Sequence, residues 1–211
     1  MRRNLLAAVA VLALIAHPAA AEPRHGVPTI SQERLLEAMK RSFNYDRLSP
    51  ELRARLDQDE MQRLCTEYRN DPPADVAERI QKAAMESVVF PPDGKFLGDW
   101  RRGERLSLDG HGLRMRDDPR RGVGGNCYAC HQMAPKELSY GTLGPSLLQY
   151  GKLRDYDAEA IRDAYIKIYN SNAAFACSIM PRYGTQKILS IEDITHVLAF
   201  LFDRESPVNK D

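Results

Sequence analysis

The order of apolar and polar residues predicts a chain built from helices. Residues 157–169 place Ile161, Tyr165 and Ile168 on one side of a helix, and this spacing matches the 3.6-residue period of the α-helix. Asp157 stands where such a helix would begin. The alternating pattern of a half-buried strand is weak along the whole chain. The pattern therefore indicates an all-α fold.

Two more helices are expected in the second half of the chain, each with its own start signal. The last one opens with Ser190 and carries Asp193 three residues later, which is the spacing of a capping box. Another begins near Asp99, a good N-cap residue. Gly103 lies in its middle and would let a second helix approach closely. The apolar stripe of the last helix consists of Ile191, Ile194, Val197, Leu198, Leu201 and Phe202.

The first half of the chain reads as an N-terminal helical extension. Residues 31–43 are amphipathic. A second helix is capped by Ser49 with Pro50 at its first position, and a third follows Asp71. The proline- and glycine-containing residues 88–98 read as a linker. The expected divisions are a signal peptide at 1–21, the helical extension and linker at 22–95, and a second helical domain at 96–211.

The first residues have the features of a secretory signal peptide. Arg2 and Arg3 precede an apolar run at 5–16, and small residues follow up to Ala21. We expect cleavage after Ala21 and a periplasmic protein. The alternative is a membrane anchor, which the shortness of the run disfavours. No later stretch is apolar enough for a membrane span in the mature chain.

Charge and cysteine content narrow the function further. The formal net charge is +1, so nothing in the charge balance favours nucleic-acid binding. The four cysteines form one close pair, Cys127 and Cys130, and two distant single residues, Cys65 and Cys177. In an exported protein we expect Cys65 and Cys177 to form a disulfide. The alternative is a free or redox-active thiol.

The close cysteine pair is followed at once by His131, which makes the sequence Cys-Tyr-Ala-Cys-His at 127–131. This is the attachment signature of c-type haem. The spacing lets both thiols reach the two vinyl groups of one porphyrin, while the adjacent imidazole binds the iron. Because the signature occurs once, we predict one covalently bound haem c.

Three other uses of this cysteine pair are conceivable. A thioredoxin-type pair requires a preceding strand, and a glycine-rich stretch at 122–125 stands there instead. A zinc site requires about four ligands at suitable spacing. A plain disulfide between Cys127 and Cys130 would close too short a loop to stabilise the fold. The haem signature explains the histidine as well, and it is the preferred interpretation.

Met180 is the expected second axial ligand of the iron. Pro181 ends any helix directly after it, and a thioether at this position raises the reduction potential of a haem. The alternatives are a methionine that merely packs in a loop, or a second histidine ligand, His111 or His196. The first ligand, His131, also requires an acceptor for its other ring nitrogen.

Pro145 is expected to supply that acceptor, because its fixed φ can present a carbonyl group rigidly beside the haem. The alternative is an ordinary Gly-Pro turn. The charged residues 114–122 precede the haem signature. They read either as a solvated loop or as a docking surface for a redox partner.

Six short motifs occur together in the second half of the chain: GNCYACH, GTLGPSL, YGK, IYN, CSIMPRYG and SPVNK. In combination they resemble the SoxX family of monohaem c-type cytochromes, over residues from about 98 to 211. The resemblance implies a class I cytochrome c-like haem domain. It also implies thioether bonds from Cys127 and Cys130, with His131 and Met180 as the metal ligands.

The resemblance also implies a function and partners. SoxX cytochromes form a periplasmic heterodimer with SoxA, and the complex is an L-cysteine S-thiosulfotransferase that couples thiosulfate oxidatively to a cysteine of the SoxYZ carrier protein. The chain would then be an electron-transfer subunit without catalytic residues of its own, which passes electrons to a soluble cytochrome. Short SoxX proteins begin near the position of Phe96, so the extension has no counterpart in them.

Two other functions remain open at this point. One is a free soluble monohaem cytochrome c that shuttles electrons to a terminal oxidase. The other is an enzyme or sensor whose haem keeps a vacant or labile sixth position. The electron-transfer subunit is preferred, because an iron with both axial positions filled has no open site for a substrate.

Overall fold

The computed structural model describes residues 30–54, 56–112, 114, 117–118 and 120–210. The expected signal peptide at 1–21 lies outside these residues. α-Helices and 3-10 helices are the only regular secondary structure in the described part of the chain, which confirms the all-α prediction. Within the same residues, none of the helices has the length and apolar character that a membrane crossing requires.

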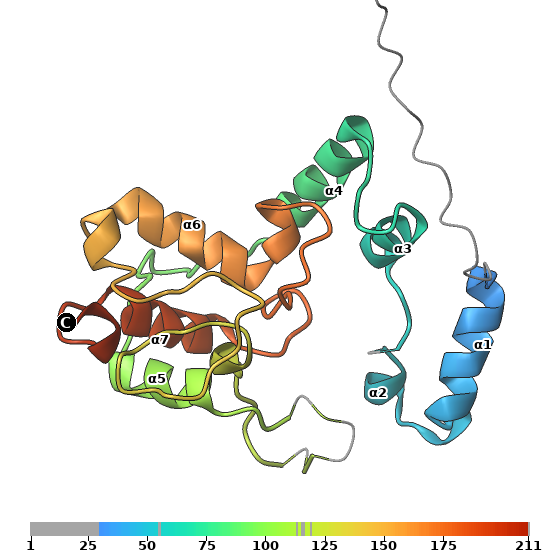
Figure 1. The fold of residues 1–211 in the computed structure, drawn as a ribbon, viewed down its shortest axis with the longest axis horizontal. Helices are drawn as coiled ribbons and strands as arrows, with labels where there is room; N and C mark the ends of the chain where they lie inside the picture. Colours follow the sequence, from blue (N-terminus) through green and yellow to red (C-terminus); the bar gives the residue numbers. More distant parts are fainter. Residues whose placement is uncertain (1–29, 55, 113, 115–116, 119, 211) are drawn as a thin grey trace, which may run out of the picture. The chain divides into compact units, whose positions relative to one another are not determined.

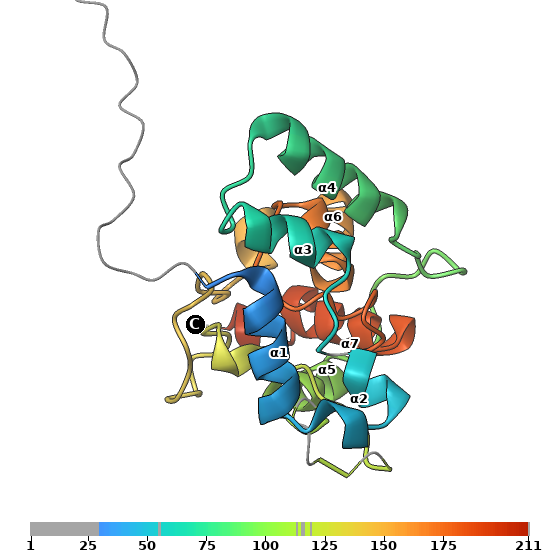
Figure 2. The ribbon, with the colours of Figure 1, turned by 90° about the vertical axis from the view of Figure 1, so that its right-hand side faces the viewer.

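The chain forms two compact units, with the boundary between Arg47 and Leu48. The first contains α1 and η1. The second contains every other helix, and so combines part of the expected extension with residues 96–211 (Figures 1 and 2). The α-helices are α1 (Gln32–Ser42), α2 (Pro50–Ala54), α3 (Glu60–Glu67), α4 (Ala74–Glu86), α5 (Trp100–Leu108), α6 (Ala158–Tyr169) and α7 (Ile191–Phe202). The 3-10 helices are η1 (Tyr45–Arg47), η2 (Cys127–Ala129), η3 (Lys152–Arg154), η4 (Ser171–Ala173) and η5 (Pro207–Asn209).

Helices α5 and α7 cross in close contact in the second unit (Figures 1 and 2). A methyl group at Gly103 would lie 1.9 Å from the carbonyl oxygen of His196, so only glycine lets the two backbones come this close. The expected role of Gly103 is confirmed. The start signals are confirmed too, because Asp99 caps α5, and Ser190 and Asp193 form a capping box at α7.

Helix α6 buries Tyr165 completely against the segment that was expected to be a linker. The Tyr165 hydroxyl donates a hydrogen bond to the carbonyl of Val89 at 2.6 Å. The Tyr165 ring stacks on Phe90 at 5.7 Å and meets the edge of Phe96 at 5.3 Å. Residues 88–98 therefore pack on the core. The prolines between Phe90 and Phe96 favour a turn, but the two aromatic rings bury enough apolar surface to hold the segment against α6.

The segment that follows Ser49 forms two helices where one was expected. Helix α2 is short, and α3 starts separately after Asp59. The Asp59 carboxylate accepts a hydrogen bond from the backbone N–H of Gln62, whose side chain accepts one from the N–H of Asp59. This second capping box starts a new helix of 8 residues, which carries Cys65.

We predict that Gly103→Ala lowers the free energy of unfolding by about 1–3 kcal/mol, because the added methyl group must push α5 and α7 apart. The matched control is Gly122→Ala, where an added methyl group meets no atom within 4 Å. Its effect should stay within about 0.5 kcal/mol. Urea unfolding measures both, and equal losses in the two variants would contradict the close crossing.

Candidate haem site

The two thiols and the imidazole of the signature come from a single turn. Helix η2 starts at Cys127, and Asn126 before it adopts the left-handed conformation with φ 49°. The N–H groups of Cys130 and His131 donate to the carbonyl of Cys127 at 3.1 and 2.9 Å. Both cysteines are free, and each residue exposes part of its surface, although the sulfur atom of Cys127 itself is buried. The structure therefore presents three adjacent donor groups from one short loop.

The sulfur of Cys127 lies in a largely apolar environment. Burial is the main cause that raises the pKa of its thiol to about 11, and a hydrogen bond with Ser107 opposes this shift only in part. A methyl group at Gly125 would lie 3.2 Å from this sulfur, so the backbone approaches it closely. Within the described residues, no group of three or more His, Cys, Asp or Glu side chains could hold a metal ion.

His131 is oriented by the loop that follows it in the sequence. Its Nδ1 lies 2.7 Å from the carbonyl oxygen of Pro145, so Nδ1–H donates and the lone pair is on Nε2. The backbone of Gly144 lies against the ring, since an added methyl group would lie 2.2 Å from its Cε1. The N–H of Gly144 also donates to the carbonyl of Cys130 at 2.9 Å. The contact expected from Pro145 is present.

Met180 lies in a loop between η4 and α7 that is held close to the cysteine turn. Its carbonyl accepts a hydrogen bond from the Ser171 hydroxyl at 2.6 Å, and its N–H donates to the Ser178 hydroxyl at 3.2 Å. Three residues later, the Tyr183 hydroxyl donates to the carbonyl of Gly125. Met180 and Cys127 pack against the same apolar core. The loop thus reaches the segment that begins the signature.

The two alternative histidine ligands are engaged elsewhere. The Nδ1 of His196 accepts the N–H of Asp99 at 2.8 Å, and its Nε2 lies 3.3 Å from the Glu192 carboxylate. The Nε2 of His111 lies 3.0 Å from the carbonyl oxygen of Asp118. The His111 side chain is only 11% exposed, although the surrounding Gly-His-Gly sequence is typical of an exposed turn. Both imidazoles stabilise local structure.

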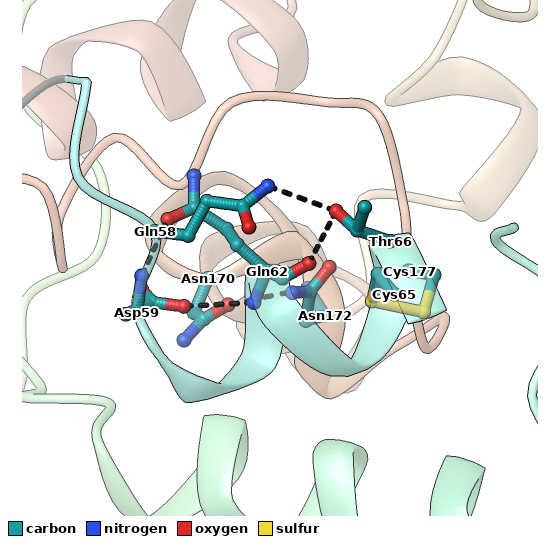
Figure 3. The surroundings of a disulfide bond; sticks show 8 residues. All are labelled: Gln58, Asp59, Gln62, Cys65, Thr66, Asn170, Asn172 and Cys177. Carbon is teal, nitrogen blue, oxygen red and sulfur yellow. Dashed lines mark hydrogen bonds between the residues drawn. A yellow bond between two sulfur atoms is a disulfide. The ribbon is translucent and has the colours of Figure 1, made fainter. Parts of the chain in front are cut away.

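Cys65 and Cys177 form a disulfide that joins α3 to the Met180 loop (Figure 3). Cys177 adopts the left-handed conformation with φ 59°. The bond spans 112 residues of sequence, and a loop of that size contributes about 4–5 kcal/mol to stability in the chain-entropy account. The pairing expected for these two residues is present in the structure.

The described charges of the segment at 114–122 pair locally. Arg114 contacts Asp117 at 3.1 Å, and Arg120 contacts Asp118 at 2.9 Å. Arg121 reaches Asp109 at 3.2 Å. Such exposed pairs contribute little to stability. The docking surface expected here stays a prediction.

The residues around the signature fit a haem. The donor set is two free thiols, an imidazole with its Nε2 lone pair available, and a thioether, which is the set that c-type haem uses. A porphyrin also requires apolar surface. Large apolar side chains are exposed shortly after the signature and directly before Met180. Leu138 and Leu143 follow the signature at 92% and 74% exposure, and Ile179 precedes Met180 at 72%.

Two residues near Met180 were missed by the sequence analysis, although they lie within the quoted motif CSIMPRYG. Tyr183 connects the loop to Gly125. Arg182 is buried and pairs with Asp59 of the extension. Their place in this motif was the only signal in the sequence that could have drawn attention to them. Their partners could not be predicted, because Gly125 and Asp59 lie more than fifty residues away in the sequence.

Comparison with known proteins finds a relative that covers most of the chain. No known protein-family model matches the chain. The chain is 37% identical over 156 residues to an Aquifex aeolicus (strain VF5) protein named "Uncharacterized lipoprotein", and the match covers 72% of this chain and 73% of that protein. Because the aligned stretch is longer than residues 96–211, it extends into the residues before 96.

We predict that the Cys127 thiol of the folded, haem-free chain reacts slowly with iodoacetamide. With its pKa raised to about 11, roughly a thousandth of it is thiolate at about pH 8, and only the thiolate reacts. The labelling rate should rise about tenfold for each pH unit up to that pKa. In urea it should level off near the ordinary thiol pKa of about 8.5. Mass spectrometry of the labelled peptide measures both rates, and identical pH profiles would refute the burial of this thiol.

Proposed function

The chain belongs to the same family as the Aquifex aeolicus lipoprotein, and we propose that it is an exported monohaem c-type cytochrome that transfers electrons. One observation carries the proposal. On a single turn, two free thiols lie beside an imidazole whose Nδ1–H donates to the Pro145 carbonyl at 2.7 Å. This arrangement directs the Nε2 lone pair of His131 outward as a metal ligand.

Each residue of the site then has one task. Cys127 and Cys130 would hold the porphyrin through thioether bonds, and His131 and Met180 would be the ligands of the iron. When bound, the haem supplies a centre that accepts and donates one electron at a time. The Pro145 carbonyl raises the basicity of His131 and fixes the orientation of its ring. If both residues bind the iron, the haem would carry electrons without binding a substrate.

The preferred setting for this electron transfer is a SoxAX-type complex. The motifs from GNCYACH to SPVNK support a SoxX-like subunit with a class I cytochrome c-like fold, paired with a SoxA-like cytochrome. Electrons released when thiosulfate is coupled to a SoxYZ-like carrier would pass through this haem to a soluble cytochrome. The sulfur chemistry would belong to the SoxA-like partner.

Export is part of the proposal. The relative is named a lipoprotein, and lipoproteins are exported before they are anchored. The basic and apolar residues that begin this chain favour the same route. The disulfide Cys65–Cys177 is suited to an oxidising compartment. We therefore place the mature protein in the periplasm.

We predict that Met180→Ala keeps its covalently bound haem but loses the weak near-infrared band of methionine–iron charge transfer. Its reduction potential should fall, because a thioether ligand raises the potential of a haem. Haem staining after denaturation, absorption spectra and redox titration measure these properties. The controls are Met85→Leu, on the exposed part of α4, and His111→Gln, and both should keep the band. A wild-type protein without covalent haem, or a high-spin wild-type ferric form, would contradict the proposal.

We predict that the chain, tagged at its C-terminus and purified from its native periplasm, carries with it a second subunit that binds its own haem. SoxX-like cytochromes work as heterodimers, so the two subunits should remain together through gel filtration in about equal amounts. Haem staining of the separated subunits measures this. A monomer with only its own haem would instead favour the free soluble cytochrome.

A further inference from the structure

Helix α3 is joined to the Met180 loop at two points, one on each side of Met180. The disulfide Cys65–Cys177 reaches the loop three residues before Met180 (Figure 3). Two residues after Met180, Nη2 of Arg182 lies 2.6 Å from Oδ2 of Asp59, the N-cap residue of α3. One short helix thus holds both ends of the stretch that carries the expected iron ligand.

The ion pair at the second point joins a buried guanidinium to a partly exposed carboxylate. The Arg182 side chain is 6% exposed and that of Asp59 is 40% exposed. Among the described residues, neither guanidinium Nη atom of Arg182 makes a well-directed hydrogen bond. The contact with the Asp59 carboxylate is therefore an ion pair, and this carboxylate balances the charge of Arg182. Removing one partner of a buried pair leaves an uncompensated charge. Arg182 is therefore held beside the start of α3.

Helix α3 is itself fixed to the rest of the second unit. Its apolar side packs with α4 around the disulfide. Helix α4 is hydrogen-bonded to the start of the loop region, where Gln81 donates to the Ala174 carbonyl at 3.0 Å and Asn170 donates to the Ser87 hydroxyl at 2.9 Å. The apolar cluster consists of Met61, Leu64, Cys65, Tyr68, Val76, Ile80, Ala176 and Cys177. A displacement of the Met180 loop would thus have to move α3 or break a link to it.

The two links matter because packing between α3 and the loop is incomplete. A partly open pocket of about 460 Å³ lies between part of α3 and the loop, and its lining includes the polar Gln62 and Asn172 as well as Met180. Where the pocket lies, the two segments lack the dispersion contacts that would hold the loop in place. On this side of the loop, the covalent bond and the ion pair are therefore the specific links between α3 and the residues around Met180.

We propose that Asp59, Cys65, Cys177 and Arg182, which we call the α3 bracket, are positioning residues that keep Met180 on the iron. This inference rests on the proposed function. An iron–thioether bond in water competes with other ligands, and a loop restrained at both ends loses less conformational freedom when the bond forms. The α3 bracket therefore favours the closed, six-coordinate state of the site.

The test uses the full-length haem-loaded protein and the variant Asp59→Asn. Asparagine is as good an N-cap residue as aspartate, so α3 should keep its start while the charge opposite Arg182 is lost. We expect the haem to stay attached and the ferric protein to bind cyanide at least about tenfold faster than wild type, a difference of about 1.4 kcal/mol. The methionine–iron band should weaken. The double variant Cys65→Ser/Cys177→Ser should shift both readings in the same direction.

The matched control is Arg63→Gln, which breaks an exposed ion pair with Glu67 on the same helix and should leave both readings unchanged. Circular dichroism establishes that each variant is folded. If Asp59→Asn and the disulfide variant bind cyanide at the wild-type rate with an intact band, the α3 bracket has no positioning role, although the proposed function stands. If the wild-type protein lacks the haem or the band, the proposed function fails and this inference fails with it.

Discussion

The close crossing of α5 and α7 at Gly103 is the constraint on which the candidate haem site depends. It holds the last turn of α5 where the Leu106 carbonyl accepts the N–H of Gly125 at 2.7 Å. It also places Ser107 beside the sulfur of Cys127. The position of the cysteine turn thus depends on the helix contact at Gly103, which precedes Cys127 by more than twenty residues in the sequence.

The two expected axial ligands are positioned in different ways. His131 and its acceptor Pro145 are 14 residues apart, and the N–H groups of the intervening loop bind back to the cysteine turn. This half of the site is nearly self-contained. Met180 depends on long-range contacts instead, because its loop is held by Tyr183 on one side and by α3 on the other. A local motif can therefore specify the histidine side, whereas the methionine side requires the assembled fold.

This difference explains what could be predicted from the sequence. The caps of α5, α6 and α7 and the role of Gly103 depend on neighbouring residues or on a single missing side chain, and these predictions are confirmed. The separate start of α3 was missed because Asp59 and Gln62 lie inside a continuous polar stretch. The packing of Phe90 and the pairing of Asp59 with Arg182 were missed because each needs a partner from a distant segment. Tertiary contacts of this kind leave no periodic signal in one chain.

Residues 48–95 should be regarded as part of the unit that contains the cysteine turn. The chain divides near residue 47, so α3 and α4 share a compact unit with the cysteine turn. The similarity to the Aquifex aeolicus protein also extends into the residues before 96. A segment that only covered the surface would need neither a disulfide to the Met180 loop nor a carboxylate that pairs with the buried Arg182. A chain that began near Phe96 would lack both the disulfide and the ion pair, and its Met180 loop would depend on the remaining contacts alone.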